Sequence, residues 1–427
     1  MIRTYRFGEI TLEDILKREE EVADVSALVS SIIADVRENG DEAVRRYSAQ
    51  FDSMTSEALA LSQEEMEEGL KEVDADFFAV LQEAAENIRL YHEKQKRTDF
   101  VVTQKQGVVL GQRVTPLERV GIYVPGGTAS YPSTVLMNAI PAKIAGVDEI
   151  VMVTPAKDGK ISPNILAAAK IAGVERIFKV GGAQAVAALA YGTQEIPCVD
   201  KIVGPGNAFV AEAKRQVFGK VAIDMIAGPS EILVIADEAS DAEIVAADLL
   251  SQAEHDKLAS AILITNSEVL AKQVAEALEE QIPLLPRAEI ARDSIDNYGK
   301  IIITETLAQA IDISNAVAPE HLEICVDDPF RYLADIRHAG SVFLGRFAPE
   351  ALGDYFAGTN HTLPTSGTAR FSSPLSVDDF VKKSSFTYYT EEALLQVADK
   401  IELFANKEGL QAHGRSVMIR KEKRSKP

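Results

Sequence analysis

Cysteine is scarce in this sequence of 427 residues, and long apolar runs are missing. The two cysteines, Cys198 and Cys325, have no CxxC spacing, which argues against a disulfide framework and a cysteine-based zinc site. No apolar run approaches the roughly 18 residues that a membrane-spanning helix needs. Residues 1–21, "MIRTYRFGEITLEDILKREEE", lack the apolar centre of a signal peptide. We therefore expect a cytoplasmic protein with no membrane partner.

Basic residues are outnumbered. The chain has 44 Lys and Arg against 65 Asp and Glu, a formal net charge of −21. A surface of this sign repels phosphate backbones, which argues against a nucleic-acid partner. The hydrophobic content of 46% and the charged content of 26% are ordinary for a globular protein, and the length allows two or three domains.

The pattern of apolar and charged residues changes near residue 101. Residues 1–100 are charged and show helical spacing, and we expect no strand before about residue 100. Beyond it, apolar strand-like runs alternate with helices in two segments joined near residue 232, followed by loops and a helical tail. Continuous apolar strands are typical of parallel sheets covered on both faces. We predict an α/β fold with two Rossmann-like parallel-sheet lobes, a helical N-terminal segment and a small helical C-terminal tail domain.

Local signals mark the ends of two helices. Ser162 is the expected N-cap of a helix that has Pro163 in its first turn and Gly173 just past its end. Ser240 and Glu243 match the capping-box pattern at the start of another helix.

Three glycine-bearing loops each follow an apparent strand and open a helix: "YVPGGTASYPS" (123–133), "VGGAQAVAALA" (180–190) and "VGPGNAFVAEAK" (203–214). Glycines in such loops let backbone N–H groups approach phosphate oxygens at a helix N-terminus. No strict GxGxxG occurs, because Gly204 and Gly206 are followed by Phe209 instead of a third glycine. The motifs alone leave dinucleotide binding and ordinary βα turns equally open.

The chain has only six histidines: His92, His255, His321, His338, His361 and His413. Gln252 and His255 lie three residues apart at the end of a helix, so that both side chains share one face. This spacing suits a metal site, and it also suits a polar surface pair. Asp248 shares the face and is interpreted as a solvated neighbour. His92 and His338 lie in charged, helix-like stretches and are expected to be exposed.

The stretch "PEHLEIC" (319–325) holds a carboxylate, an imidazole and a thiol. Adjacent side chains of a strand point to opposite faces, so Glu320 and His321 can share a site only if the chain turns at Pro319. Otherwise the carboxylate simply fixes a histidine at a strand start. Cys325 lies in an apolar run, where burial makes a thiol inert. We interpret Cys325 as core and Cys198 as core or surface.

Several stretches, in order along nearly the whole chain, resemble those of histidinol dehydrogenases: "GIYVPGGTASYPSTVLMNAIPAKIAGV", "KVGGAQAVAALAYGT", "DKIVGPGNAFVAEAKRQV", "IDMIAGPSEILVIAD", "DLLSQAEHD", "APEHLEI" and "GDYFAGTNHTLPTSGTARF". The resemblance implies oxidation of L-histidinol through L-histidinal to L-histidine with two NAD+ and one bound Zn2+, the last step of histidine biosynthesis. The runner-up interpretation is a zinc-dependent hydrolase without nicotinamide chemistry.

The resemblance also implies roles for individual residues. The implied zinc ligands are Gln252, His255, Asp354 and His413. The implied substrate contacts are these four together with Ser230, His321 and Glu408. The implied cofactor contacts are Tyr123, Gln184 and Asn207. Glu408 and His413 would come from the second subunit of a homodimer. His361 is left outside the ligand set, as a residue that could support it.

Glu320 and His321 are the acid–base pair that the resemblance implies. We expect His321, with a pKa near about 6.5, to take the hydroxyl proton in the first oxidation. Glu320 would activate the water that hydrates the aldehyde before the second oxidation. The expected domains are an arm at 1–22 that packs with the C-terminal part, a first lobe of 23–100 plus 233–366, a second lobe of 101–232 with the cofactor loops, and a dimer-forming tail at 367–427.

Overall fold

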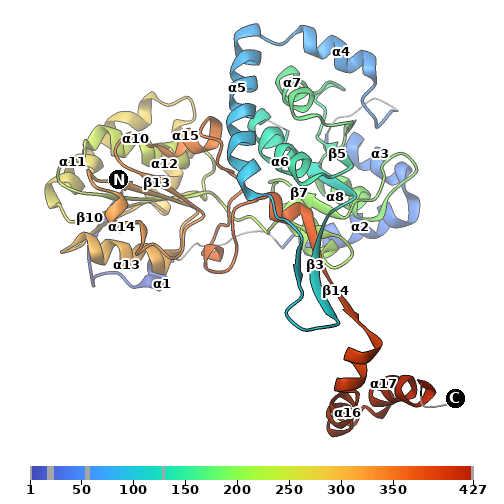
Figure 1. The fold of residues 1–427 in the computed structure, drawn as a ribbon. Helices are drawn as coiled ribbons and strands as arrows, with labels where there is room; N and C mark the ends of the chain where they lie inside the picture. Colours follow the sequence, from blue (N-terminus) through green and yellow to red (C-terminus); the bar gives the residue numbers. More distant parts are fainter. Residues whose placement is uncertain (1, 17–23, 53–57, 127–129, 425–427) are drawn as a thin grey trace. The chain divides into compact units, whose positions relative to one another are not determined.

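A computed structural model describes residues 2–16, 24–52, 58–126 and 130–424. The chain forms two compact units, one from residues 1–96 and 117–380 and the other from residues 97–116 and 381–427 (Figure 1). The larger unit contains two lobes, each built on its own parallel sheet. No helix among the described residues has the length and apolar character needed to span a bilayer.

Six parallel strands form the sheet of the first lobe, in the order β1-β11-β10-β9-β12-β13. Their bounds are β1 Arg3–Arg6, β9 Glu231–Ala236, β10 Ser260–Thr265, β11 Lys300–Ile303, β12 His321–Cys325 and β13 Ser341–Leu344. Every residue of β9 and β10 is buried, which explains their continuous apolar sequences. Ile232 and Val234 join the core on one face of the sheet, while Leu233 and Ile235 join the core on the other.

Helices cover both faces of this sheet. Helices α10 (Ala242–Ala253), α11 (Glu268–Gln281) and α12 (Ala288–Asn297) pack on one face, and α13 (Leu307–Val317) and α1 (Leu12–Leu16) pack on the other (Figure 1). Two short helices, α14 (Phe330–Leu333) and α15 (Glu350–Tyr355), follow β12 and β13 along the chain.

The second lobe contains five parallel strands in the order β6-β5-β4-β7-β8. Their bounds are β4 Arg119–Tyr123, β5 Glu149–Val153, β6 Arg176–Phe178, β7 Lys201–Val203 and β8 Ala222–Ile223. One core contains α6 (Pro132–Ala145) and α7 (Pro163–Ala172), and the other contains α8 (Gly182–Tyr191) and α9 (Ala208–Val217). Both sheets are therefore sandwiched by helices, as the sequence predicts.

The smaller unit has a different architecture. Strands β2 (Phe100–Val102), β3 (Val108–Pro116) and β14 (Val381–Tyr389) form an antiparallel sheet in the order β14-β3-β2. Two helices, α16 (Glu391–Lys407) and α17 (Gln411–Arg424), follow and pack against each other. The remaining elements are short 3-10 helices at Glu93–Gln95, Ile282–Leu284, Thr368–Arg370 and Val377–Phe380.

The structure differs from the expected domain division in the placement of the N-terminal helices. Helices α2 (Ser26–Asn39), α3 (Asp41–Phe51), α4 (Gln63–Lys71) and α5 (Ala75–His92) make their main contacts with α6, α7, α8 and α9, and α5 also bonds to the lobe of residues 233–366, through Phe356 and Asn360. The physical reason is burial, because Val29, Ile32 and Val36 of α2 complete the core over α8. Residues 24–52 and 58–92 thus belong with the five-stranded lobe.

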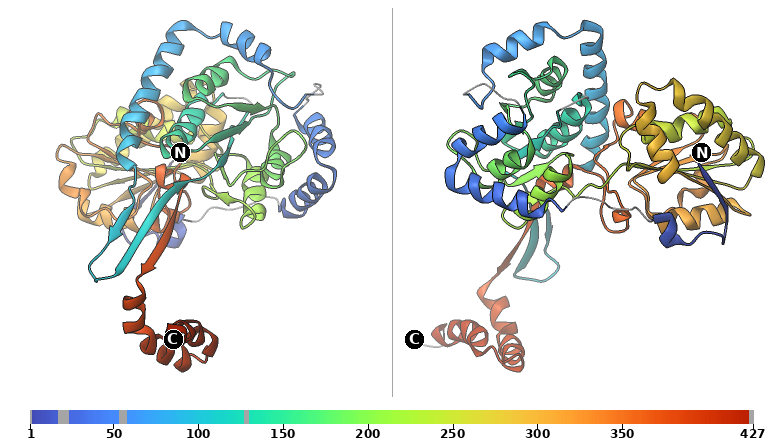
Figure 2. Two further views of the ribbon diagram at one scale, coloured as in Figure 1. Left: turned by 45° about the vertical axis from the view of Figure 1, so that its right-hand side comes forward. Right: turned by 180° about the vertical axis from the view of Figure 1, so that it is seen from behind.

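The expected boundaries also differ at both ends of the chain. A strand does precede residue 100, because β1 pairs in parallel with β11 at the edge of the six-stranded sheet (Figure 2). Strand β3 pairs with β14 on one side and with β2 on the other, so residues 100–116 belong to the smaller unit and not to the second lobe, and the C-terminal part of that unit begins at 381 instead of 367. Residues 17–22 of the expected arm lie outside the described residues.

The expected exposure of His92 is wrong. His92 ends α5 and is fully buried, with Nδ1 2.7 Å from Oε1 of Gln95 and Nε2 3.5 Å from Nδ2 of Asn360. Burial lowers the pKa of His92, so this histidine is a satisfied core residue. His338 is half-buried.

Candidate active site

A cavity of about 320 Å³ lies where loops of the two lobes meet. The five-stranded sheet presents the carboxyl ends of β4 and β7 to it, through Pro125 and Gly204, which is the usual ligand edge of a parallel sheet. The six-stranded sheet presents the amino ends of β9 and β12. From this lobe the lining includes Ser230, Gln252, His255, Glu320, His321, Asp354 and His361.

His321 is the first residue of β12, and its buried ring is held through Nδ1. Nδ1 lies 2.9 Å from the backbone oxygen of Glu231 and 3.0 Å from Nε2 of Gln252. Because the Glu231 oxygen is an acceptor, Nδ1 carries a proton. Nε2 lies 3.7 Å from Oε1 of Glu350 and 3.8 Å from Oδ1 of Asp354, and it has no hydrogen-bond partner.

Carboxylates dominate the electrostatics of this imidazole. Burial alone would lower the pKa of His321, but Glu320, Glu350 and Asp354 raise it to about 10. Without a cation, the pKa of His321 thus lies above the value of about 6.5 that is usual for a histidine. A divalent cation beside Asp354 would offset the same negative charge and bring the pKa back toward neutral.

Glu320 reaches the same cavity because the chain turns before β12. Ala318 has a φ of +54°, in the left-handed region that a non-glycine residue seldom adopts. The turn that the sequence requires is thus present, one residue before Pro319. Oε2 of Glu320 accepts a hydrogen bond of 2.8 Å from the backbone N–H of Glu231. Burial raises the pKa of Glu320 to about 7, although the neighbouring His321 opposes the shift.

Gln252 and His255 come from the end of α10, as their spacing indicates. Gln252 lies in the last turn and is 1% exposed, and its Oε1 has no hydrogen-bond partner. His255 follows the end of the helix, and its backbone N–H donates to the backbone oxygen of Gln252 at 3.1 Å. Burial lowers the pKa of His255, which favours the neutral imidazole that can bind a metal.

Asp354 lies on α15 between two imidazoles. Its Oδ1 is 3.8 Å from Nε2 of His321 and 3.9 Å from Nδ1 of His361. Burial alone would raise the pKa of Asp354, but the two histidines lower it well below its usual value. His361 therefore lies at the site, next to a residue that the resemblance makes a ligand.

Sequence reasoning missed Glu350 as a functional residue. It lies one turn before Asp354 on α15, and its buried Oε1 faces His321 without a hydrogen-bond partner. The i, i+4 spacing of Glu350 and Asp354 was the only available signal, because it places both carboxylates on one helix face. Nothing in the sequence alone shows that this face meets β12.

The donor set fits a divalent cation. Ligand atoms of His321, Glu350 and Asp354 lie within 4.8 Å of one another, and of these three residues Asp354 is the one that the resemblance makes a ligand. Gln252 adds a buried amide oxygen that no protein donor satisfies, an unusual cost unless a ligand completes it. Nitrogen and oxygen ligands without a thiolate suit a cation that keeps positions open for a substrate.

The three glycine-bearing loops differ in what they contribute to the cavity. The hydroxyl oxygen of Tyr123 accepts a hydrogen bond of 3.1 Å from the N–H of Gly182, and Gln184 lies on the same helix start. Asn207 lines the cavity and caps α9 through bonds to the N–H groups of Phe209 and Val210. Residues 127–129 of the first loop lie outside the described residues.

Gly204 shows why one of these loops needs glycine. Its φ is +113°, and a Cβ there would lie 2.1 Å from the backbone oxygen of Tyr123. Any side chain would therefore push β4 and β7 apart at the edge that forms the cavity. This close approach is a structural requirement, whatever the loop binds.

The remaining implied contacts are divided between the two units. Ser230 precedes β9 and lines the cavity. Glu408 follows α16 and His413 lies in α17, both exposed and both in the smaller unit. Their part in the site stays a prediction.

Two parallel-sheet lobes that together line a cavity with a buried imidazole, clustered carboxylates and an unpartnered amide oxygen are typical of an α/β enzyme. The family model described as histidinol dehydrogenase matches residues 16–421. The chain belongs to the histidinol dehydrogenase family, and it is an oxidoreductase of histidine biosynthesis.

Individual relatives agree with this assignment. A histidinol dehydrogenase of Bacillus cereus is 59% identical over 392 residues, covering 92% of this chain and 91% of its own length. One of Clostridium acetobutylicum is 54% identical over 415 residues, covering 97% and 96%. The crystal structure of histidinol dehydrogenase from Elizabethkingia anophelis has a TM-score of 0.94 at 38% identity, covering 99% of this chain and 98% of that one.

Proposed function

We propose that this chain oxidises L-histidinol through L-histidinal to L-histidine in two steps, each with one NAD+ as hydride acceptor. The observation that carries the proposal is the placement of His321 between Glu320 and the Glu350–Asp354 pair, beside the unpartnered amide oxygen of Gln252. Together these groups supply a base, a second base and a metal-binding set in one cavity.

The proposed zinc ligands are Gln252, His255 and Asp354, with His413 contributed by a second copy of the chain. When bound, Zn2+ would clamp the imidazole and amine nitrogens of the substrate and orient its carbinol carbon. The chemistry of the three described ligand residues supports this, because they offer an amide oxygen, a neutral imidazole and a carboxylate. A homodimer with Glu408 and His413 at the shared site, and a cytoplasmic location, belong to the same proposal.

His321 acts as the base for the alcohol. Its Nδ1 donates to the Glu231 oxygen, so the ring presents Nε2, which has no protein hydrogen bond, to the cavity. An imidazole fixed in this way can take the hydroxyl proton as hydride leaves the carbinol carbon. The surrounding carboxylates stabilise the resulting imidazolium.

Glu320 acts in the second step. The aldehyde has no O–H proton to lose, so water must add before a second hydride can leave. The raised pKa of Glu320, about 7, suits a carboxylate that accepts a proton from that water near neutral pH. His321 then takes the proton of the hydrate. Tyr123, Gln184 and Asn207 are the proposed cofactor contacts of the five-stranded lobe.

The decisive experiment counts NADH formed per histidinol consumed by the purified protein. Two NADH are expected, and a yield of one would mean that the reaction stops at the aldehyde. A protein that consumes substrate without any rise in NADH absorbance would instead support the zinc-dependent hydrolase. A chelator should abolish the activity, and zinc should restore it; full activity in the chelated protein would contradict the metal assignment.

A further inference from the structure

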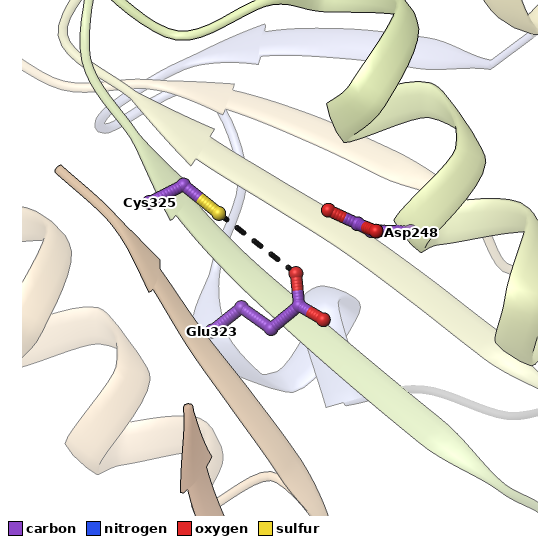
Figure 3. Close-up of side chains that lie close together, drawn as sticks. All are labelled: Asp248, Glu323 and Cys325. Atoms are coloured by element: carbon purple, nitrogen blue, oxygen red, sulfur yellow. Dashed lines mark hydrogen bonds between the residues drawn. The ribbon is translucent and has the colours of Figure 1, made fainter. Parts of the chain in front are cut away.

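The polar face of β12 continues beyond the site. His321, Glu323 and Cys325 alternate along the strand and point toward α10, while Leu322 and Ile324 pack into the opposite core. Figure 3 shows two of these residues, Glu323 and Cys325, facing Asp248 of α10. A strand that is apolar on one face is thus polar on the other, and the mechanism uses only its first residue.

Glu323 is fully buried and makes a bond that fixes another element. Its Oε1 accepts a hydrogen bond of 2.7 Å from the backbone N–H of Glu350, the first residue of α15. Pro349 precedes this helix and offers no side-chain cap, so the first N–H group of α15 depends on Glu323. A buried N–H group without a partner destabilises the folded protein. The bond to Glu323 therefore favours the position of α15 in which its first N–H group reaches Glu323.

The bond connects two elements that carry the active-site residues. Strand β12 carries both His321 and Glu323, and α15 carries both Glu350 and Asp354. Glu350 and Asp354 lie one helical turn apart and face the same nitrogen of His321, at 3.7 and 3.8 Å. The Glu323–Glu350 bond therefore fixes the position of the two carboxylates relative to the imidazole.

Other contacts of α15 are compatible with this role and do not replace it. The Ser251 hydroxyl donates to Oε2 of Glu350 at 3.2 Å, which orients the side chain and leaves the backbone free. Gly353 lies so close to the ring of Phe343 that a Cβ would be 2.6 Å from Cε1. The helix thus lies against β13 on one side, and Glu323 anchors its first turn.

Asp248 completes the arrangement. Its carboxyl group faces that of Glu323 (Figure 3). Burial, together with the charge of Asp248, raises the pKa of Glu323. A glutamine at position 323 keeps an oxygen that can accept the bond from Glu350 and places no negative charge beside Asp248.

We propose that Glu323 is a positioning residue, which holds the start of α15 on β12 so that Asp354 and Glu350 face His321. Its consequence for metal binding rests on the proposed function, because it takes Asp354 as a ligand. Residues that hold metal ligands in place typically influence metal affinity by roughly 10–100-fold.

The test compares three variants of the full-length protein. Glu323→Gln keeps an oxygen that can accept from the N–H of Glu350, Glu323→Leu removes this acceptor at similar size, and Cys325→Ala perturbs the same buried face while leaving the bond to Glu350 intact. The first readout is amide hydrogen exchange of residues 350–355 in protein freed of metal by a chelator. The second is the affinity for Zn2+ alone, measured in a competition assay well below the melting temperature of each variant.

Glu323→Leu should exchange faster at residues 350–355 and bind Zn2+ about 10–100-fold more weakly. Glu323→Gln and Cys325→Ala should match the parent protein within about threefold in both readouts. If Glu323→Leu does not fold, Glu323→Asp serves instead, because its shorter side chain withdraws the acceptor from Glu350. A folded variant of either kind with unchanged exchange at 350–355 would overturn the proposal, and so would a glutamine variant as impaired as the leucine one.

The Asp354→Asn variant separates this proposal from the proposed function. If Asp354→Asn binds Zn2+ as the parent does, the ligand assignment fails, but the exchange result still decides whether Glu323 anchors α15. If Asp354→Asn loses Zn2+ while Glu323→Leu changes neither exchange nor affinity, the ligand assignment holds and the positioning role fails.

Discussion

Two neighbouring clusters on the same face of β12 look alike in composition and differ in behaviour. His321, Glu350 and Asp354 form the outer cluster, and Asp248, Glu323 and Cys325 form the inner one; in each, three potential ligand atoms lie within 4.8 Å of one another. The outer cluster has two buried polar atoms without a partner, and two of its residues line the cavity. In the inner cluster, no side-chain N or O atom among the described residues is both buried and unpartnered.

The difference shows that hydrogen-bond satisfaction separates a reactive cluster from a structural one. Buried polar groups normally find partners, because an unmade hydrogen bond costs more than a made one gains. Glu323 meets this rule by accepting from the N–H of Glu350 and from the thiol of Cys325. His321 and Glu350 leave an atom each for something that the protein does not supply. Residue type alone would have assigned a metal to both clusters.

The largest expected effect tests which cluster holds the metal. The parent protein should bind one equivalent of Zn2+ per chain by elemental analysis. Asp354→Asn, which keeps the size of the side chain but removes its charge, should lose that metal and nearly all activity, more than the roughly 10–100-fold caused by indirect perturbations. A second equivalent that survives in Asp354→Asn and disappears in Cys325→Ser would show that the inner cluster also binds a metal, so that the two clusters do not differ in this respect.

A second effect concerns the base of the outer cluster. His321→Asn should lower kcat by about 10²–10⁴-fold, the usual contribution of a general base, because asparagine retains a polar group near Glu231 but cannot take the proton. Zinc content and histidinol affinity should change little, since His321 is not a proposed ligand. Steady-state kinetics with metal analysis measures both, and near-normal turnover would remove His321 from the mechanism.

A smaller and more selective effect is expected for Glu320. In Glu320→Gln the amide oxygen can still accept from the N–H of Glu231, so the turn before β12 should persist. Oxidation of histidinal should slow by about 10²-fold, the lower end of general-base effects, and oxidation of histidinol should slow less. Assaying the two substrates separately measures the ratio; equal losses in both steps would contradict a role specific to water activation.

Much of the fold was predictable because its pattern is local. Continuous apolar strands alternating with helices indicated two covered parallel sheets, and Pro163 and Gly173 bounded a helix that runs from 163 to 172. The prediction that Ser240 is the N-cap of α10 is wrong. Asp241 caps the helix, and the Ser240 hydroxyl donates to the backbone oxygen of Cys325 at 2.8 Å. Both residues suit an N-cap, and only the tertiary contact decides between them.

The site was predictable only where its residues are close in sequence or carried by the resemblance. The spacing of Gln252 and His255 correctly placed them together at the end of α10. The interpretation of Asp248 as a solvated neighbour missed that it faces Glu323, which lies 75 residues further on. No local pattern encodes such a contact. The assignment of α2 to the wrong lobe has the same cause, because its apolar stripe shows that it packs but not on what.

The smallest effect is expected for substitution of Cys325, although its thiol lies close in sequence to the proposed acid–base pair. Cys325 is buried beside Glu323, with Sγ 3.9 Å from Oε2, and burial raises the pKa of its thiol, so a thiolate is scarce at neutral pH. Cys325→Ser should therefore keep kcat for both oxidation steps within about twofold, and it should cost stability on the order of 1 kcal/mol for burying a hydroxyl. Thermal unfolding measures the stability, and the two-step assay measures the rates. If Cys325→Ser lost turnover while zinc content and unfolding temperature stayed normal, the inner cluster would take part in the chemistry and the difference between the clusters would vanish.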